Sequence, residues 1–371
     1  MASPREIVVV GAGVVGCAVA YELTKRGASV EIIDDRPAGM GATQASAGVL
    51  APFIEARADG PLLELTARSL DLYDAFIAGV TRDRGCTVNY ERTGTLDVAL
   101  HAASMSELAA RQAFLARKGI AAELMDAAAV RAAEPSVCAD ALGGLLIATH
   151  GFVAAAELTS ALAVAARHHG ARLFECGRVR RVALSQGELR VDTDRGSLAA
   201  DAVVVAAGSW AGQLHIDGTT PLPVKPIRGQ LLQLRWSGPL LNRVVWGERC
   251  YIVPWRDHTV LVGATIEDAG FDERTTVAGV RDLMEAACEL VPNAWTASVG
   301  APKVGLRPAT PDHLPIVGAS TIIPNLMYAT GHYRNGVLLA PLTADLVARS
   351  MLDGTKDPML EHMVPQRFGA L

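Results

Sequence analysis

Three glycines near the N-terminus constrain the fold of this chain more than any other feature. Gly11, Gly13 and Gly16 form a G-x-G-x-x-G pattern between an apolar run at 6–10 and an expected helix at 14–26. The first glycine permits a tight turn, the second leaves room for a pyrophosphate, and the third lets the helix pack closely on the strand. Because a helix N-terminus also offers free N–H groups to phosphates, the pattern predicts a dinucleotide-binding turn.

The segment that follows supports this prediction. Residues 29–33 read as a second strand, and Asp34 lies 18 residues after Gly16, close to the spacing of about 20 for the acid that accepts a ribose hydroxyl. These features do not separate FAD from NAD. The strand–helix alternation then stops, however, and 36–52 reads as a long loop rich in Gly, Ala, Ser and Thr. An NAD domain would continue the alternation, and a loop of this length is usually functional.

The remaining chain shows both helical and strand patterns, without an internal repeat or a flexible linker. We therefore expect an α/β protein whose parts are interleaved in sequence. Helices are expected near 61–84, 104–118, 127–132, 155–169, 275–290 and 336–352. Strands are expected near 87–90, 94–100, 178–183, 187–193 and 202–206, with several more in 228–263.

Composition excludes some classes of function. The 371 residues, half of them hydrophobic, can form two compact domains or one large one. The net charge is −5 with no basic block, which argues against a nucleic-acid partner. The apolar stretch 7–21 is too short to span a membrane, so we expect no membrane association and a cytoplasmic location. The histidines and cysteines show no metal-ligand spacing, so no metal is expected.

Two later segments could approach a bound ligand. After the strand at 202–206 come small residues and Gly208, which would let the backbone pass close to a nucleotide, although a simple strand–turn explains them equally well. The segment 331–339 leads into the last helix, whose positive N-terminal end could face a ligand. The alternative is an ordinary loop before a surface helix.

Taken together and in this order, these segments resemble the D-amino acid oxidase superfamily of FAD-dependent amine oxidoreductases, and within it the bacterial glycine oxidases. The stretches that carry the resemblance are 11–16, TQASAGVL at 43–50, 203–210, CYIVP at 250–254, VGAT at 262–265, GLRP at 305–308 and GHYRNGVLLAP at 331–341. The resemblance implies a Rossmann-type FAD-binding domain interleaved with a substrate domain built on a mainly antiparallel β-sheet. The expected boundaries are 1–86, 146–217 and 301–371 for the FAD domain, and 87–145 and 218–300 for the substrate domain.

The resemblance also implies roles for individual residues. Arg307 would grip a substrate carboxylate, Tyr251 would add a hydroxyl to it, and Arg334 would lie at the flavin edge. A guanidinium matches a carboxylate bidentately, although a lone arginine is more often solvated or structural. The residues expected to bind the cofactor are Gly11, Gly13, Gly16, Asp34, Thr43, Ala47, Gly48, Val179, Gly208, Arg334, Asn335, Gly336, Val337 and Leu338.

The implied activity is the oxidative deamination of glycine and other small amines, such as sarcosine and small D-amino acids. The products would be an oxo acid, ammonia and hydrogen peroxide, with non-covalent FAD and oxygen as the oxidants. The enzyme would serve thiamine thiazole synthesis, with hand-off to a thiazole synthase, and would form a homo-oligomer. The alternatives are a D-amino acid or sarcosine oxidase or dehydrogenase, and a flavoprotein subunit of a larger complex. One departure from the glycine oxidase pattern is Val49, which replaces a methionine and leaves the substrate preference open.

Overall fold

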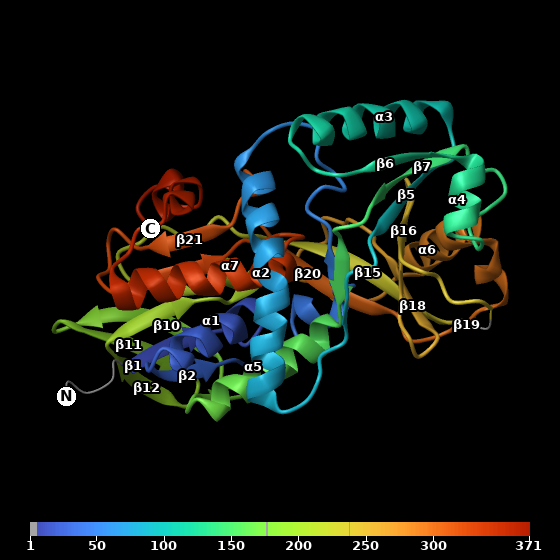
Figure 1. Cartoon of the computed structure of the whole chain (residues 1–371). Coiled ribbons are helices and arrows are strands. Elements are labelled where there is room, and N and C mark those ends of the chain that lie inside the picture. Colours follow the sequence, from blue (N-terminus) through green and yellow to red (C-terminus); the bar gives the residue numbers. More distant parts are fainter. Residues whose placement is uncertain (1–5, 176, 237) are drawn as a thin grey trace.

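A six-stranded sheet forms the centre of one half of the molecule (Figure 1). The computed structural model describes residues 6–175, 177–236 and 238–371. In spatial order the strands are β21 (Ile316–Ala319), β22 (Leu326–Thr330), β13 (Ala202–Val205), β1 (Glu6–Val10), β2 (Ser29–Ile33) and β9 (Arg172–Phe174). All neighbours pair in parallel except β21 and β22. The central strands read as continuous apolar runs because both faces of the sheet are covered.

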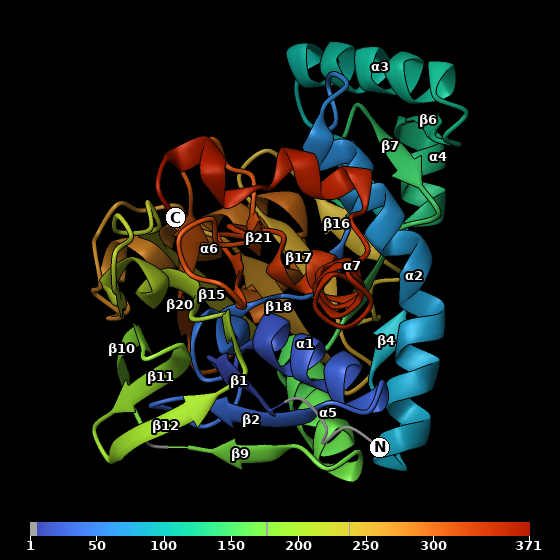
Figure 2. The same ribbon diagram turned by 90° about the vertical axis from the view of Figure 1, so that its left-hand side faces the viewer.

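Helices cover one face of this sheet and a small, mainly antiparallel sheet covers the other (Figure 2). The helices are α1 (Val14–Lys25), α2 (Pro61–Arg84), α5 (Ala155–His168) and α7 (Gly336–Ala348). The small sheet has the order β12 (Gly196–Ala200), β11 (Glu188–Thr193), β10 (Val179–Ser185) and β14 (His215–Ile216). Two apolar cores result, one on each face of the central sheet.

Helix α7 contains a proline, and α2 compensates for it. Pro341 has no N–H, so the carbonyl of Val337 loses its partner within the helix. The buried hydroxyl of Tyr73 donates a hydrogen bond to that carbonyl at 2.7 Å, and Ser69 donates to the next one, Leu338 O, at 2.6 Å. These two bonds from α2 hold the first turn of α7 in place, and that turn borders the functional site described below.

The other half of the molecule is built on a nine-stranded, mainly antiparallel sheet. Its main path is β19 (Ser298–Val299), β15 (Lys225–Arg235), β18 (Thr259–Gly263), β17 (Tyr251–Pro254), β16 (Val244–Trp246), β5 (Thr95–Ala99), β7 (Gly143–Ile147) and β6 (Glu123–Asp126). Helices α3 (Ala102–Arg117), α4 (Ala127–Ala133) and α6 (Val277–Leu290) pack on it (Figure 1). The ninth strand, β20 (Lys303–Ala309), pairs with β15.

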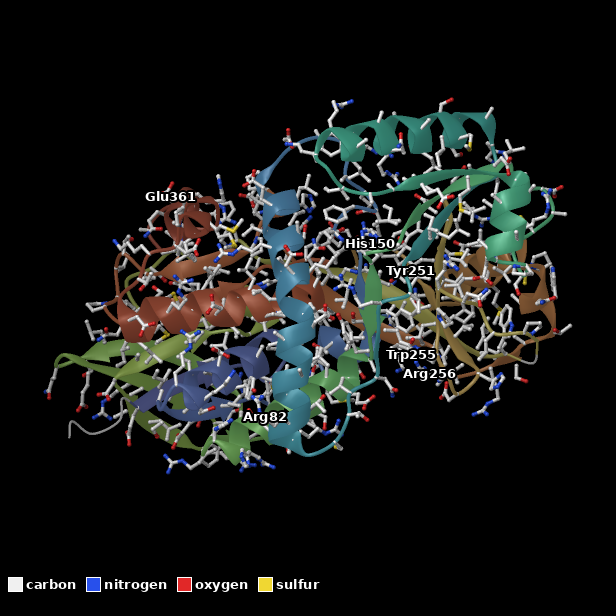
Figure 3. All side chains as sticks on the ribbon, in the orientation of Figure 1. Arg82, His150, Tyr251, Trp255, Arg256 and Glu361 are labelled. Carbon is white, nitrogen blue, oxygen red and sulfur yellow. The ribbon has the colours of Figure 1, made fainter. Side chains whose placement is uncertain are left out.

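Several connections join the two halves. Strand β20 belongs to the large sheet, and the chain then continues directly into β21 of the six-stranded sheet. A fourth, three-stranded sheet lies at the junction and consists of β3 (Val49–Leu50), β8 (Gly151–Val153) and β4 (Tyr90–Glu91). His150 and Tyr251 lie near it (Figure 3). The division into an FAD domain and a substrate domain at the boundaries given above remains a proposal.

The expected elements agree closely with the observed helices. Helix α2 begins at Pro61 and ends before Gly85, which adopts a left-handed conformation with φ +83°. The expected strands were less complete. Those without a counterpart among the expected elements are β3, β6, β7, β8, β9, β12, β14, β19, β20, β21 and β22. Within the ranges that the structure describes, no helix is both long and apolar enough to cross a membrane.

Candidate active site

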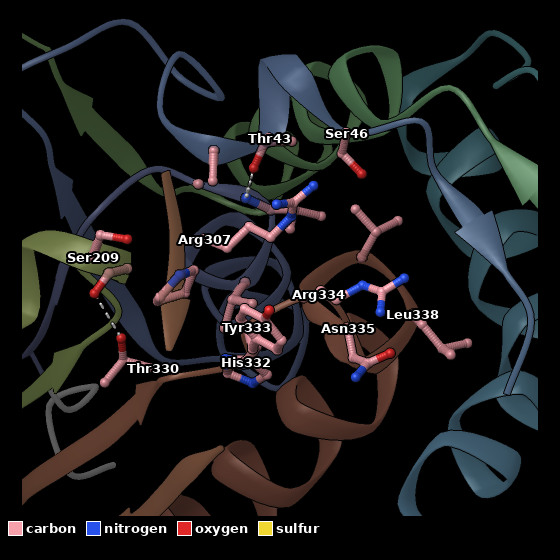
Figure 4. Close-up of a pocket in the computed structure, with 18 of the residues that line it drawn as sticks. Thr43, Ser46, Ser209, Arg307, Thr330, His332, Tyr333, Arg334, Asn335 and Leu338 are labelled. Carbon is pink, nitrogen blue, oxygen red and sulfur yellow. Dashed lines mark hydrogen bonds between the residues drawn. The ribbon is translucent and has the colours of Figure 1, made fainter. Parts of the chain in front are cut away.

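A cavity of about 770 Å³ lies between the six-stranded sheet and the large sheet (Figure 4). Its walls include the ends of β1 and β2, the first turns of α1 and α7, and side chains of β17 and β20. Every residue predicted to bind cofactor or substrate lines this cavity, apart from Gly16. The structure therefore brings together positions that are up to about 330 residues apart in the chain.

The glycine turn at the start of α1 is shaped for close approach of a ligand. Gly11 has φ +110°, and a Cβ atom there would lie 2.5 Å from Ala206 O. A Cβ atom on Gly16 would lie 1.9 Å from Gly11 O, so this glycine lets the helix pack against the turn. In contrast, a Cβ atom on Gly13 would have only the Thr43 hydroxyl within 4 Å, at 3.8 Å. The open space over Gly13, beside a helix N-terminus, fits a pyrophosphate.

Asp34 follows β2 and fixes the same turn. Its carboxylate accepts hydrogen bonds from Ala12 N at 2.6 Å and from Arg36 N at 2.9 Å. Burial raises the pKa of Asp34 above its ordinary value, while these backbone bonds oppose the shift. The carboxylate also lines the cavity, so it can accept a hydrogen bond from a hydroxyl group of a ribose bound there.

The segment 36–52, expected as a loop, contains a short 3₁₀ helix, η1 (Ala42–Ala45), and strand β3. The Thr43 hydroxyl accepts a hydrogen bond from Val14 N at 3.2 Å, which ties this segment to the first turn of α1. Gly48 has φ +69°, and a Cβ atom there would lie 1.7 Å from Val153 O. Only glycine fits at that position. Gly48 and Ala47 together line this part of the cavity with small residues.

The first turn of α7 forms another wall. Residues 334–338 all line the cavity, and the helix begins at Gly336. Behind this turn, His332 is fully buried, with Nε2 at 3.0 Å from the Thr343 hydroxyl. Burial lowers the pKa of His332 to about 3, so its imidazole is neutral. The positive charge at this end of the cavity therefore comes from the helix N-terminus and Arg334.

Arg307 is the most enclosed cation among the predicted substrate residues. It projects from β20, and its Nη1 donates to Thr265 O at 2.9 Å and to Arg228 O at 3.4 Å. In the described part of the chain, no carboxylate lies within ion-pairing distance of its guanidinium. Burial lowers the pKa of Arg307, as expected for a partly buried guanidinium without a carboxylate to compensate for its charge. A carboxylate-bearing ligand would supply that compensation.

Tyr251 lies beside the two arginines. Its ring stacks on Trp246 with centroids 4.7 Å apart, and burial raises the pKa of its phenol while Arg307 and Arg334 oppose that rise. Arg334 also faces the pocket, and its Nη1 lies 2.8 Å from the carboxylate of Glu55 (Figure 4). This part of the cavity thus combines the phenol of Tyr251 with the guanidinium groups of Arg307 and Arg334.

Sequence reasoning did not single out several residues that line the cavity. Among them are Arg36, Ile54, Glu55, Trp210, Trp246, Ile266 and His313. No recognisable motif marks Glu55 or Trp246, because they come from a loop and from an interior strand of the large sheet, β16, that meet only in the folded chain. Trp210 ends the stretch 203–210, in which only Gly208 is predicted to bind the cofactor.

The described cysteines, Cys17, Cys86, Cys138, Cys250 and Cys288, lie away from the cavity. Within the described ranges no cysteine lines it, and Cys17 is a buried thiol whose pKa is raised to about 12 by burial. Gly305, on β20, faces η1, and a Cβ atom there would lie 2.9 Å from Ala45 Cβ and 3.0 Å from Ala42 O. Neither feature offers a thiol to a bound cofactor.

Comparisons with known proteins identify the family and the fold of the chain. The sequence model of the FAD dependent oxidoreductase family matches residues 6–350, and the chain belongs to this family of flavin-dependent enzymes. Glycine oxidase from Geobacillus kaustophilus is 35% identical, over 92% of each chain. Its crystal structure superposes with a TM-score of 0.92, covering 99% of both chains at 32% identity. The resemblance, the α/β fold class and the FAD cofactor expected from the sequence are therefore confirmed.

Two further similarities bear on function. The bifunctional protein ThiO/ThiG of a Nostoc species is 37% identical over 96% of this chain, but the chain spans only 54% of that protein, about half its length. The crystal structure of iminodiacetate oxidase from Chelativorans sp. BNC1 has a TM-score of 0.89 and 29% identity, covering 97% of this chain and 98% of that one.

Proposed function

We propose that this chain catalyses the FAD-dependent oxidative deamination of glycine and other small amines. Overall, glycine, oxygen and water would give glyoxylate, ammonia and hydrogen peroxide. The observation that carries the proposal is the partly buried guanidinium of Arg307, which has no carboxylate partner among the described residues and lies in the same cavity as the dinucleotide cradle. Glycine oxidases of similar sequence and structure support the choice of a small amino acid.

The protein residues act by positioning the substrate. Arg307 would bind the carboxylate through two N–H groups, and Tyr251 would donate its phenolic proton to the same group. Burial keeps the Tyr251 phenol protonated, because it raises the pKa. Two fixed contacts on the carboxylate would hold the α-carbon at one place in the cavity, and such positioning can account for a large part of catalysis. Bound FAD supplies the chemistry of hydride acceptance and of electron transfer to oxygen.

We propose that the cofactor-binding residues are those named from the sequence. The glycines at 11, 13 and 16 and Asp34 would hold the adenosine and pyrophosphate, with Val179 beside the adenine. The residues proposed to line the flavin are Thr43, Ala47, Gly48, Gly208, Arg334, Asn335, Gly336, Val337 and Leu338. The amine must lose its proton before oxidation. His332 lines the cavity with its Nε2 on the Thr343 hydroxyl, and burial lowers its pKa to about 3, so the protein holds it as a neutral imidazole.

A second candidate substrate is a secondary amine with two carboxylates. The observation that favours it is the second guanidinium, Arg334, which is paired only with Glu55 from a partly exposed loop. The similar iminodiacetate oxidase acts on such a compound, as its name states. Comparing the rates of oxidation of iminodiacetate, glycine, sarcosine and D-amino acids separates these substrates. Comparing oxygen with a quinone as the electron acceptor tests whether the enzyme is a dehydrogenase.

The biological setting is also a proposal. Fusion of the similar ThiO region to ThiG in the bifunctional relatives supports a role in thiamine thiazole synthesis with transfer to a thiazole synthase. A homo-oligomer and a cytoplasmic location stay predictions from the sequence analysis.

The test is to add glycine to the purified chain under air-free conditions and record its absorption spectrum. We expect loss of the oxidised flavin bands, and on admission of air we expect their return together with hydrogen peroxide. A flavin spectrum that glycine, sarcosine and small D-amino acids leave unchanged would refute the proposed substrate class. Activity only in the presence of other proteins would instead identify a subunit of a larger complex.

A further inference from the structure

An ion pair links the two halves of the molecule beside the cavity. Arg36, just after β2, lines the cavity next to Asp34. Its Nη1 and Nη2 donate to the two carboxylate oxygens of Glu273 at 2.9 Å and 2.8 Å. Glu273 belongs to the loop 264–276 between β18 and α6 of the large-sheet half. The bidentate geometry makes this a directional contact between the two halves.

Aromatic rings extend the same contact. The guanidinium of Arg36 lies 4.4 Å from the ring centroid of Trp210, which also lines the cavity. Trp210 in turn lies 5.9 Å, centroid to centroid, from Phe271 of the loop 264–276. Arg36 and Trp210, which line the cavity, are therefore each in contact with a residue of the same loop, Glu273 and Phe271 respectively.

This loop is firmly attached at its base. Arg228, on β15, is only 7% exposed and pairs with Glu267 at 2.6 Å and Asp272 at 3.0 Å. Gln230 donates to the Glu267 carboxylate at 2.7 Å and accepts from Thr276 N at 2.9 Å. The Arg36–Glu273 pair is more exposed, with side chains 32% and 31% accessible. Opening is therefore easier at this pair than at the base of the loop.

We infer that Arg36, Trp210, Phe271 and Glu273 form a closure over the cofactor cavity, which must open before bound FAD can leave. The cradle around Gly13 and Asp34 holds the dinucleotide from the six-stranded sheet side, and the closure adds a wall supplied by the other half. Arg36 and Trp210 are cofactor-retaining residues in this inference, and Glu273 and Phe271 position them. The inference rests on FAD binding alone and is independent of which amine is oxidised.

The test measures FAD release from the holoenzyme. After free FAD is removed, the protein is diluted and the rise in flavin fluorescence gives the dissociation rate. We expect Glu273→Gln to speed release roughly two- to tenfold, the range expected for loss of a partly exposed ion pair. Phe271→Leu should also speed release, although the ion pair remains.

A matched control is Arg68→Gln. Arg68 makes a similar bidentate pair with Asp357 at 3.0 Å and 2.8 Å, with 36% of its side chain exposed, and does not line the cavity. The Arg68→Gln variant should leave the FAD dissociation rate unchanged.

Salt provides a second test of the ion pair. At about 1 M salt, where the screening length is about 3 Å, FAD release from the wild type should speed up more than FAD release from Glu273→Gln.

Equal dissociation rates for the wild type, Glu273→Gln and Phe271→Leu would overturn the inference. Equal acceleration by Arg68→Gln would also overturn it, since the effect would then reflect general loss of stability. Both results differ from a wild type that holds no flavin at all, which would contradict the cofactor assignment itself.

Discussion

The guanidinium of Arg307 lies directly over the backbone of Gly229, so a Cβ atom on residue 229 would be 2.3 Å from Cζ of Arg307. Both residues belong to the paired strands β15 and β20, in which Ile227 is the register partner of Arg307. The missing side chain at 229 thus creates the space in which the arginine lies.

We therefore predict that Gly229→Ala displaces the Arg307 side chain. The KM for glycine should rise by at least about tenfold, the equivalent of about 1.4 kcal/mol, with a smaller change in kcat. Steady-state kinetics measure both constants, and the flavin absorption of the variant should remain as in the wild type. A KM equal to that of the wild type would mean that the carboxylate is held elsewhere.

Arg307→Ala should cripple turnover of amino acids. A charge-assisted hydrogen bond contributes roughly 1.5–3 kcal/mol, so kcat/KM should fall roughly 10- to 150-fold, largely through KM. Arg307→Lys should recover little activity, because an ammonium group cannot form the two-pronged contact. Wild-type kinetics in either variant would contradict the proposal that Arg307 binds the substrate carboxylate through two N–H groups.

The FAD should be bound without a covalent link. Acid precipitation of the purified protein is expected to leave the yellow colour in the supernatant. Gly305 is packed against η1, and none of the cysteines in the described ranges lines the cavity, so no thiol there is placed to form such a link. Colour that pellets with the protein would contradict this prediction.

Substrate size should depend on Val49, which lines the cavity. We expect glycine and sarcosine to be oxidised well and bulky D-amino acids poorly, while the short valine could admit D-alanine or D-proline. Val49→Met should then reduce kcat/KM for these larger substrates relative to glycine, because filling a pocket changes discrimination by about 1–3 kcal/mol. If a bulky D-amino acid is preferred to glycine by more than tenfold, the glycine assignment fails.

Acid should destabilise the protein partly through His150. Its Nδ1 lies 2.8 Å from the Thr95 hydroxyl and its Nε2 accepts from Phe53 N at 3.2 Å. Burial lowers the pKa of His150 to about 3, from 6.5. The unfolded chain therefore binds the proton more readily, and the stabilisation is present above about pH 6.5 and is lost as the pH falls toward 3.

The corresponding test compares urea unfolding of the wild type and His150→Gln at pH 7 and pH 5. The wild type should lose more free energy of unfolding between these values, by up to ~1.4 kcal/mol per pH unit. His332 is buried in the same way and stays in both proteins, so it cancels in the comparison. Parallel losses in the two proteins would show that His150 does not titrate in this range.

Much of the fold could be predicted from local sequence. The glycine turn, the apolar strands 6–10 and 202–205, and the long helix between Pro61 and Gly85 each have a signal within a few residues. Strands β6, β7, β9, β12, β20, β21 and β22 were not predicted, because most of them are short and obtain their stability from pairing with strands that are distant in the chain. The roles of Arg307, Tyr251 and Arg334 came from family resemblance, since none of the three has a local signal of its own.

The sequence by itself thus determined the cofactor turn and the family, because close approach to a phosphate requires glycines at fixed spacing. Tertiary structure alone decided which other side chains share the cavity. Arg36 and Glu273 are distant in sequence and meet because the large sheet packs beside the six-stranded one, and Glu55 and Arg334 are brought together by the placement of the loop after β3 next to the start of α7. Such contacts arise from long-range packing, and no periodicity or spacing along the chain encodes them.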